Sequence, residues 1–217
     1  MIKAIIFDLD GVLVDTAKFH FVAWKKLAKD LGTDISEAQN EQLKGVSRVD
    51  SLERIIEWGN LQISDQEKEA ALISKNAHYL ELCDQLSPED LLPGVREFLT
   101  EIGEKGLHVA VGSASKNANL ILRKLGISTF LDTLIDGNMT TKGKPDPQVF
   151  LMAAEQMHVE PWQAIVFEDA PKGVDAAKAG GFNSVGVGSY NVLGHANLVI
   201  PGFKDINLNT ILKQFED

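Results

Sequence analysis

The stretch that decides the fold is KAIIFDLDGVL, residues 3–13. Its first part, residues 3–7, is a short apolar run that stops at acidic residues and glycine, which is typical of a strand buried in a sheet. Two carboxylates, Asp8 and Asp10, come directly after that strand. Because open parallel sheets bind ligands at the carboxyl ends of their strands, Asp8 and Asp10 are candidate functional groups. Taken alone, the same residues also fit a simple turn.

The chain after this strand divides into a helical part and a mixed part. Residues 16–83 read as helices throughout, from helical apolar spacing at 16–31 and 50–58 and from capping boxes at Ser36–Gln39 and Ser64–Glu67. From residue 84 on, strands and helices alternate. The expected strands are residues 107–111, 133–135, 164–167, 184–187 and 198–200. The expected helices are residues 94–106, 115–125, 173–179 and 207–215, with one more helix that follows an Asp146 N-cap and has Pro147 at its first position.

Alternating strands and helices predict an α/β fold: a Rossmann-like parallel sheet core with helices on both faces. We expect residues 1–15 and 84–217 to form this catalytic core and residues 16–83 to form an inserted helical cap. Gly143 leaves open how rigidly Lys144 is held, and residues 188–202 carry no feature that we can interpret.

Composition restricts the classes of partner. The net charge of −10 over 217 residues argues against general nucleic-acid binding, which needs a basic surface. No apolar run approaches the ~18 to 20 residues that cross a bilayer, and the first residues do not read as a signal peptide. A single cysteine, Cys83, excludes an intrachain disulfide and favours the cytosol. We expect a cytoplasmic monomer that acts on small molecules, without nucleic-acid or membrane partners.

Chemically capable residues gather at several predicted strand ends. Ser113 follows the strand at 107–111, Glu168 and Asp169 follow the strand at 164–167, and Lys144 precedes the helix that starts near Asp146. Each also has a structural interpretation, since Ser caps helices and acids stabilise helix N-termini. Together with Asp8 and Asp10 they form a set suited to Mg²⁺, with a carboxylate to attack phosphorus and a lysine to offset the charge.

The order of these motifs resembles the haloacid dehalogenase superfamily: DLDGVL at 8–13, then Ser113, then KPDP at 144–147, then Glu168-Asp169. The resemblance implies that Asp8 is the nucleophile and Asp10 the general acid and base. It also implies one Mg²⁺ per active site, held by Asp8, the Asp10 carbonyl and Asp169 with Glu168 contributing, and phosphoryl contacts from Ser113, Ala114 and Lys144. The acid at position 10 points to phosphate esters rather than to dehalogenation.

Several stretches of the cap, with residues 113–117 of the core, resemble the β-phosphoglucomutase branch of that superfamily. The candidate substrate-binding residues are Thr16, His20, Trp24, Lys44, Gly45, Val46, Ser47, Arg48, Ser51, Lys75, Ser115, Lys116 and Asn117. This resemblance implies the interconversion of β-glucose 1-phosphate and glucose 6-phosphate through an aspartyl phosphate and β-glucose 1,6-bisphosphate, which also primes the enzyme.

The cap residues keep alternative interpretations. Thr16, His20 and Trp24 are spaced four apart and so share one helix face, where His20 would hydrogen-bond Asp10 or a sugar hydroxyl, or serve only as a structural histidine. Trp24 also fits a core position. The planar guanidinium of Arg48 suits a distal phosphate, whereas Lys75 without the resemblance would read as solvated.

Two other functions remain open. One is a sugar-phosphate phosphatase of the same superfamily. The other is a non-catalytic Rossmann-like binding module, against which the absence of Gly-x-Gly-x-x-Gly after a strand counts.

Overall fold

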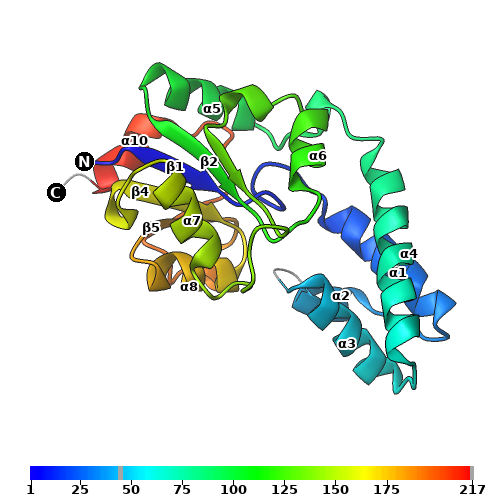
Figure 1. Ribbon diagram of the computed structural model, residues 1–217. Coiled ribbons are helices and arrows are strands. Elements are labelled where there is room, and N and C mark those ends of the chain that lie inside the picture. Colours follow the sequence, from blue (N-terminus) through cyan, green and yellow to red (C-terminus); the bar gives the residue numbers. More distant parts are fainter. Residues whose placement is uncertain (44–45, 216–217) are drawn as a thin grey trace. The chain divides into compact units, whose positions relative to one another are not determined.

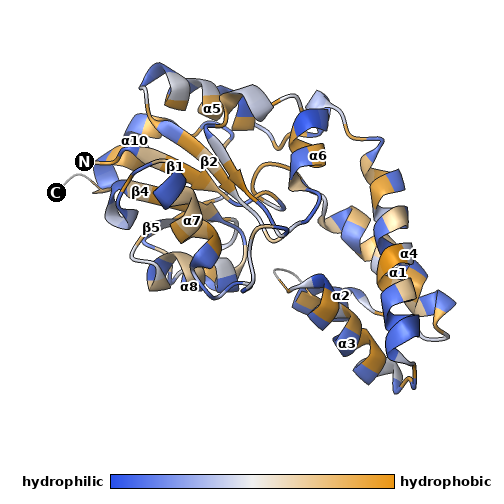
Figure 2. Ribbon diagram, in the orientation of Figure 1, coloured by the Kyte–Doolittle hydropathy of each residue, from blue (hydrophilic) through white to orange (hydrophobic). Residues whose placement is uncertain are grey.

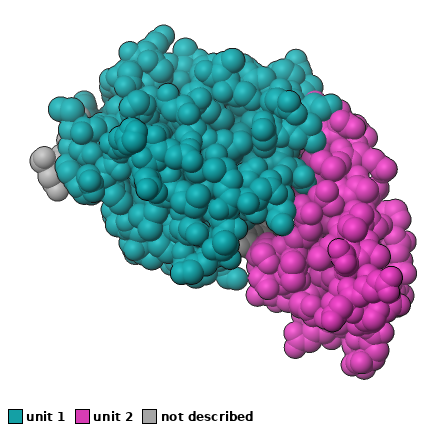
Figure 3. Space-filling model, viewed as in Figure 1, with its two compact units in different colours: residues 1–15, 87–217 teal, residues 16–86 magenta. Residues whose placement is uncertain are grey.

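A computed structural model describes residues 1–43 and 46–215 of the chain. The chain forms two compact units, Met1–Asp15 with Ser87–Asp217, and Thr16–Leu86 (Figure 3). It returns to the first unit at Ser87, whereas the sequence placed this return at residue 84. Within the first unit, Val14 forms an antiparallel bridge with Leu91, and the N–H of Leu92 donates to the carbonyl of Leu13 at 3.0 Å. The outgoing and returning segments are therefore hydrogen-bonded to each other.

The first unit is built on a six-stranded parallel sheet in the order β3-β2-β1-β4-β5-β6 (Figure 1). Its strands are β1 Ala4–Phe7, β2 His108–Gly112, β3 Thr133–Ile135, β4 Ala164–Glu168, β5 Asn183–Val187 and β6 Leu198–Ile200. Every strand predicted from the sequence is present, within one residue at each end. In the register, Ile5 lies beside Val109 of β2 and Ile165 of β4.

Helices cover both faces of the sheet. They are α5 Val95–Glu104, α6 Ala118–Lys124, α7 Gln148–Gln156, α8 Pro171–Ala179, α9 Tyr190–Leu193 and α10 Leu208–Leu212, with short 3-10 turns at Pro88–Asp90, Ser128–Phe130, Pro161–Gln163 and Lys213–Phe215. Helix α7 packs on β1, β2 and β3 and α8 on β4 and β5, while α5 packs on β2 and α10 packs on α5. The predicted α/β class is confirmed.

Strand β1 is buried on both faces, which explains its continuous apolar run (Figure 2). On one face Ile6 joins an apolar cluster with Phe150 of α7 and Ala177 of α8. On the other, the ring of Phe7 stacks on Phe167 at 5.2 Å and meets Phe98 of α5 edge-on at 6.3 Å. The residue that follows Phe7 is therefore held by a rigid strand.

The second unit is a helical cap made of α1 Ala17–Asp30, α2 Glu37–Leu43, α3 Arg48–Gly59 and α4 Asp65–Cys83. Its core is an apolar cluster that includes Trp24 and Leu27 of α1 and Leu52 and Ile55 of α3. Both predicted capping boxes form: Ser36 bonds Gln39, and Ser64 bonds Glu67. Residues 16–43 and 46–86 contain no strand, as the sequence predicts.

Some helix ends differ from the prediction. Helix α7 has Pro147 rather than Asp146 at its cap, and the Asp146 carboxylate instead accepts from the N–H of Gln148 at 3.0 Å. Helix α8 starts at Pro171, two residues before the predicted Gly173, and α3 starts at Arg48, capped by Ser47. Helix α9, only four residues long, was not predicted. Among the described residues, no helix is both long enough and apolar enough to cross a membrane.

Candidate active site

The centre of the sheet is where the strand order changes direction. Strands β1 and β4 lie side by side there, and the N–H of Asp8 donates to the carbonyl of Phe167 at 2.9 Å. Asp8 therefore follows one central strand, while Glu168 ends the other and Asp169 comes next. This is the position where open parallel sheets bind ligands.

Asp8, Glu168 and Asp169 form an acidic cluster in which each residue offers one carboxylate oxygen, all within 4.8 Å of one another. Asp8 is 7% exposed and Glu168 is 1% exposed. Burial, together with the charges of Glu168 and Asp8, raises the pKa of Asp169 to about 8, and burial also raises the pKa of Glu168. A bound cation stabilises the ionised form of carboxylates that lie this close together, and a donor set made only of oxygens fits Mg²⁺.

Lys144 is buried against this cluster. Its ammonium lies 2.5 Å from Oδ1 of Asp8, also donates to Glu168, and lies 4.8 Å from the ring centre of Phe150. Burial alone lowers the pKa of Lys144, but the attraction of Asp8 and Glu168 outweighs it, and the pKa is raised. Lys144 therefore carries a positive charge at neutral pH.

The loop before Lys144 is held by α7. The side-chain oxygen of Gln148 accepts from the N–H of Thr141 at 2.9 Å and from that of Lys142 at 2.8 Å. These hydrogen bonds attach the backbone two residues before Lys144 to α7, so Gly143 is the one residue between this attachment and Lys144.

Two glycines let the backbone approach the acids. A Cβ at Gly11, which has a φ of +83°, would lie 2.1 Å from Oδ2 of Asp169. A Cβ at Gly173 would lie 1.8 Å from Oε1 of Glu168, whose other oxygen accepts from the N–H of Ala170 at 3.0 Å. Asp10 is half-buried in the same turn, where it bridges Val14, and its side chain is not part of the three-residue cluster.

The loop after β2 is fixed by its own serines. Ser113 is buried, its N–H donates to the carbonyl of Ile135 at 2.9 Å, and its hydroxyl accepts from the N–H of Ser115 at 3.0 Å. The Ser115 hydroxyl accepts from the N–H of Asn117 at 3.2 Å. Because these bonds bind residues 113–117 into successive turns, α6 starts at Ala118 and not at residue 115 as predicted. Ala114 and Lys116 are exposed.

A second constellation lies within the cap. The ammonium of Lys75 lies 2.9 Å from Nδ1 of His20 and 4.5 Å from the ring centre of Trp24. The His20 ring stacks on Tyr79 with centroids 4.1 Å apart. Burial, then Lys75, then Arg48 lower the pKa of His20 well below its usual 6.5. His20 is therefore neutral at pH 7. Lys75 is 3% exposed and not solvated.

The other predicted cap residues occupy mostly structural positions. Thr16 is buried at the start of α1, and Trp24 lies in the apolar cluster of the cap, which supports its core interpretation. The Ser47 hydroxyl accepts from the N–H of Asp50 at 3.1 Å, and the Ser51 hydroxyl donates to the Ser47 carbonyl at 2.8 Å. Val46 is half-buried, and Lys44 and Gly45 lie outside the described residues.

The sequence analysis missed one residue of the cap constellation, Tyr79, and one buried acid at a strand end, Asp136. Tyr79 stands four residues after Lys75 on α4, so helical spacing from Lys75 could have found it. Asp136 is buried directly after β3, and the rule that strand ends carry ligand-binding residues applies to it as well.

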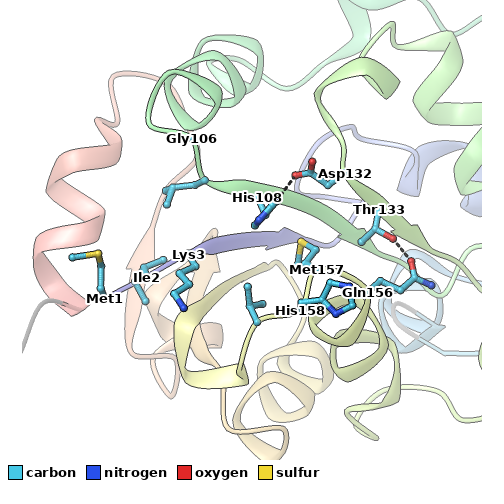
Figure 4. A pocket seen from close by; sticks show the side chains of 12 residues that line it. Met1, Ile2, Lys3, Gly106, His108, Asp132, Thr133, Gln156, Met157 and His158 are labelled. Atoms are coloured by element: carbon cyan, nitrogen blue, oxygen red, sulfur yellow. Dashed lines mark hydrogen bonds and ion pairs between the residues drawn. The ribbon is translucent and has the colours of Figure 1, made fainter.

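The opposite edge of the sheet carries a cavity of about 900 Å³ (Figure 4). It is lined at the starts of β1, β2 and β3 by residues such as Lys3, His108 and Thr133, and by the end of α7 with Gln156. His108 bonds Asp132 at 3.2 Å, and Thr133 bonds Gln156. None of the clustered acids lines it, so it is separate from the candidate active site.

Comparison with known proteins agrees with this geometry. Residues 2–181 match the haloacid dehalogenase-like hydrolase family. The chain is 39% identical over 216 residues to a β-phosphoglucomutase of Bacillus subtilis, covering 99% of this chain and 96% of that protein. It is 31% identical over 187 residues to a phosphorylated carbohydrates phosphatase of Thermotoga maritima, covering 84% and 83%.

A solved structure supports the same relationship. The crystal structure of a β-phosphoglucomutase from Clostridium difficile superposes with a TM-score of 0.95 at 41% identity, covering 99% of this chain and 97% of the other. That match spans cap and core together. The match of the family model, the acidic cluster and this agreement in structure have one explanation: the chain belongs to the haloacid dehalogenase-like hydrolase family.

Proposed function

We propose that this protein is a β-phosphoglucomutase that interconverts β-glucose 1-phosphate and glucose 6-phosphate. The observation that carries this proposal is the similarity to proteins of that name along almost the whole chain, cap included. We expect the cap to distinguish substrates, because the acidic cluster of the core suits phosphoryl transfer in general. A cytoplasmic location fits a chain whose single cysteine, Cys83, is buried.

Asp8 and Asp10 have different tasks in the proposed reaction. Asp8, phosphorylated, gives its phosphoryl group to the 6-hydroxyl of β-glucose 1-phosphate, while Asp10 takes the proton of that hydroxyl. The product is β-glucose 1,6-bisphosphate, which turns end for end. The Asp8 carboxylate then attacks the phosphorus at the other end, the bond from phosphorus to O1 breaks, and Asp10 returns its proton to O1. Glucose 6-phosphate leaves and Asp8 is phosphorylated again. A trace of the bisphosphate primes the first turnover.

The core groups around Asp8 make attack by one anion on another possible. We assign to Asp8, Asp169 and the Asp10 carbonyl, with Glu168, the binding of one Mg²⁺, which when bound supplies positive charge at the transferring phosphoryl group. Lys144 lies 2.5 Å from the attacking carboxylate and is charged, so it offsets the same negative charge. Ser113 and the N–H of Ala114 complete the phosphoryl contacts.

A mutase also needs a binding site for the phosphate group of the substrate that is not reacting. We assign this role to the cap, chiefly to Arg48, whose planar guanidinium suits two phosphate oxygens. His20, neutral with its proton on Nε2, is a hydrogen-bond donor suited to a sugar hydroxyl. Among residues 113–117, Ser115, Lys116 and Asn117 are further candidates for contact with the substrate.

One assay separates this function from its alternative. The protein is incubated with β-glucose 1-phosphate, Mg²⁺ and a trace of β-glucose 1,6-bisphosphate, and both glucose 6-phosphate and free phosphate are followed. The mutase produces glucose 6-phosphate without releasing phosphate. Dominant phosphate release would establish a sugar-phosphate phosphatase, similar to the phosphorylated carbohydrates phosphatase of Thermotoga maritima that is 31% identical to this chain. Asp8→Asn should abolish either activity, and turnover that survives it would contradict both.

A further inference from the structure

Asp136 and Asn138 form a hydrogen-bonded clip directly after β3. Asp136 is 9% exposed, and its Oδ1 accepts from the N–H of Asn138 at 2.8 Å. Its Oδ2 accepts from the side-chain Nδ2 of Asn138 at 3.1 Å. The Asp136 carboxylate therefore holds both the backbone and the side chain of Asn138.

The clip reaches the loop that follows β2. Nδ2 of Asn138 also donates to the carbonyl of Lys116 at 2.9 Å, and the N–H of Gly137 donates to the carbonyl of Ser115 at 3.2 Å. The side chain of Asn138 thus joins a buried carboxylate on one segment to a backbone carbonyl on the other. The two segments are connected at successive residues, beyond the end of the paired strands.

The two segments approach too closely for a side chain between them. A Cβ added to Gly137 would lie 2.2 Å from the carbonyl oxygen of Ala114 and 3.2 Å from the amide nitrogen of Lys116. The loop at residues 113–116 therefore contacts the backbone of Gly137, where there is no room for a side chain. The backbone of Ala114 and Lys116 is thus packed directly against the segment that carries Asp136 and Asn138.

Along the loop, as far as the structure describes the chain, N–H groups that donate a hydrogen bond within the protein alternate with N–H groups that do not. The N–H groups of Ser113, Ser115 and Asn117 are bound to Ile135 and to the two serine hydroxyls. In the described part of the chain, the N–H groups of Ala114 and Lys116 have no such partner. These two donors are the ones available to a phosphoryl oxygen, and the clip fixes the peptide groups that carry them.

We propose that Asp136 and Asn138 are positioning residues, which hold the loop at residues 113–116 so that its free N–H groups bind the transferring phosphoryl group. The inference rests on the proposed phosphoryl transfer at Asp8. Preorganised donors stabilise the charge that develops during transfer, and a loop that must be ordered in each turnover loses part of this benefit. The clip therefore acts on kcat and on the binding of phosphoryl-transfer mimics.

The test compares Asn138→Ala with Asn183→Ala. Asn183 is a matched control because its Nδ2 also donates to a backbone carbonyl at 2.9 Å, that of Trp162, at the start of β5 and away from the acids. We expect Asn138→Ala to lower kcat about tenfold and to weaken inhibition by orthovanadate by a similar factor, with a smaller change in KM. Asn183→Ala should leave kcat and vanadate inhibition unchanged.

A second pair of variants separates positioning from simple loss of stability. Asp136→Asn keeps an acceptor for the N–H of Asn138 and should retain more activity than Asp136→Ala. If Asn138→Ala changes vanadate inhibition no more than Asn183→Ala does, the positioning role is overturned. If the wild type shows no turnover that depends on Asp8, the proposed function itself is overturned. If the wild type turns over normally and Asn138→Ala is unaffected, only the positioning role is overturned.

Discussion

The ammonium of Lys75 lies 2.9 Å from Nδ1 of His20, and this contact fixes the tautomer of the imidazole. An ammonium group only donates hydrogen bonds, so Nδ1 accepts and the proton of the neutral ring is on Nε2. The ring is also stacked on Tyr79, which limits its rotation. His20 is therefore presented as a donor in one defined orientation.

Replacing Lys75 by methionine should raise the pKa of His20. The charge of Lys75 is, after burial, the largest influence that lowers this pKa, and methionine removes the charge while filling similar space. The measurement is a titration of the His20 ring by ¹⁵N NMR, which also reports the tautomer. Lys68→Met on the same helix is the control, since Lys68 pairs with Glu53 at 2.8 Å on the surface. An unchanged His20 pKa in Lys75→Met would contradict the contact.

The contribution of His20 to the stability of the protein should fall as the pH is lowered below about 6.5, the usual pKa of histidine. His20 has a lowered pKa in the folded state, so in this window the unfolded chain binds more protons than the folded one. The slope from His20 is at most about 1.4 kcal/mol per pH unit. Urea unfolding between pH 5 and 7, compared with His20→Gln, isolates this contribution. Equal slopes in the two proteins would show that His20 titrates normally.

Lys144→Ala should damage both stability and activity. The substitution leaves two buried carboxylates without their cation, which costs about 3–5 kcal/mol in metal-free protein. It also removes charge stabilisation of phosphoryl transfer, for an expected loss in kcat of about 100- to 1000-fold. Unfolding with EDTA and turnover with Mg²⁺ measure the two effects. Lys142→Ala is the matched control: Lys142 lies two residues away, is 67% exposed in its side chain and pairs with Asp146 at 3.2 Å. It should change stability by less than about 1 kcal/mol.

Gly173→Ala should destabilise the protein, although alanine is the better helix former. The new Cβ would lie 1.8 Å from Oε1 of Glu168, so the carboxylate or the start of α8 must move, at a cost of about 1–3 kcal/mol. The comparison is Gly103→Ala in α5, where no atom lies within 4 Å of the added carbon. There the substitution should stabilise by about 0.5–1 kcal/mol. Weaker Mg²⁺ binding is expected for Gly173→Ala alone. Thermal unfolding of both variants, and Mg²⁺ titration by calorimetry, give the answer.

Arg48→Ala should lower mutase turnover far more than hydrolysis of a small aryl phosphate. The aryl ester has no second phosphate, so only the sugar bisphosphate loses a charge-assisted contact, for an expected difference of about 10- to 100-fold. Arg54→Ala is the control on the same helix, because Arg54 is engaged with the carbonyl of Gln42 at 2.7 Å. Equal losses on both substrates would refute a role for Arg48 at the distal phosphate.

The sheet was predictable because its strands are buried on both faces and so read as continuous apolar runs, as in β1. The acids at their ends followed from the same argument. Helix starts were less predictable, because local hydrogen bonds compete with the helix. The serines at 113 and 115 bind the N–H groups of Ser115 and Asn117, and α6 begins only at Ala118.

The burial of Lys75 could not be predicted from the sequence around it. A lysine in a charged helix normally lies in solvent, and what buries this one is contact with His20, 55 residues away, and with the faces of Trp24 and Tyr79. The clip of Asp136 and Asn138 is likewise invisible until β3 is placed beside β2. Contacts between distant segments decide both features.

Because Val14 bridges Leu91 within the core, the inserted cap can be replaced by a different insert. The core holds the two ends of the insertion together through its own backbone, so the distance that an insert must span is set by the core and not by the insert. A helical insert of different length or sequence closes the same short gap, at a loop entropy that grows only slowly with length. New substrate preferences can then arise by replacement of residues 16–86, while the strand that carries Asp8 keeps its register.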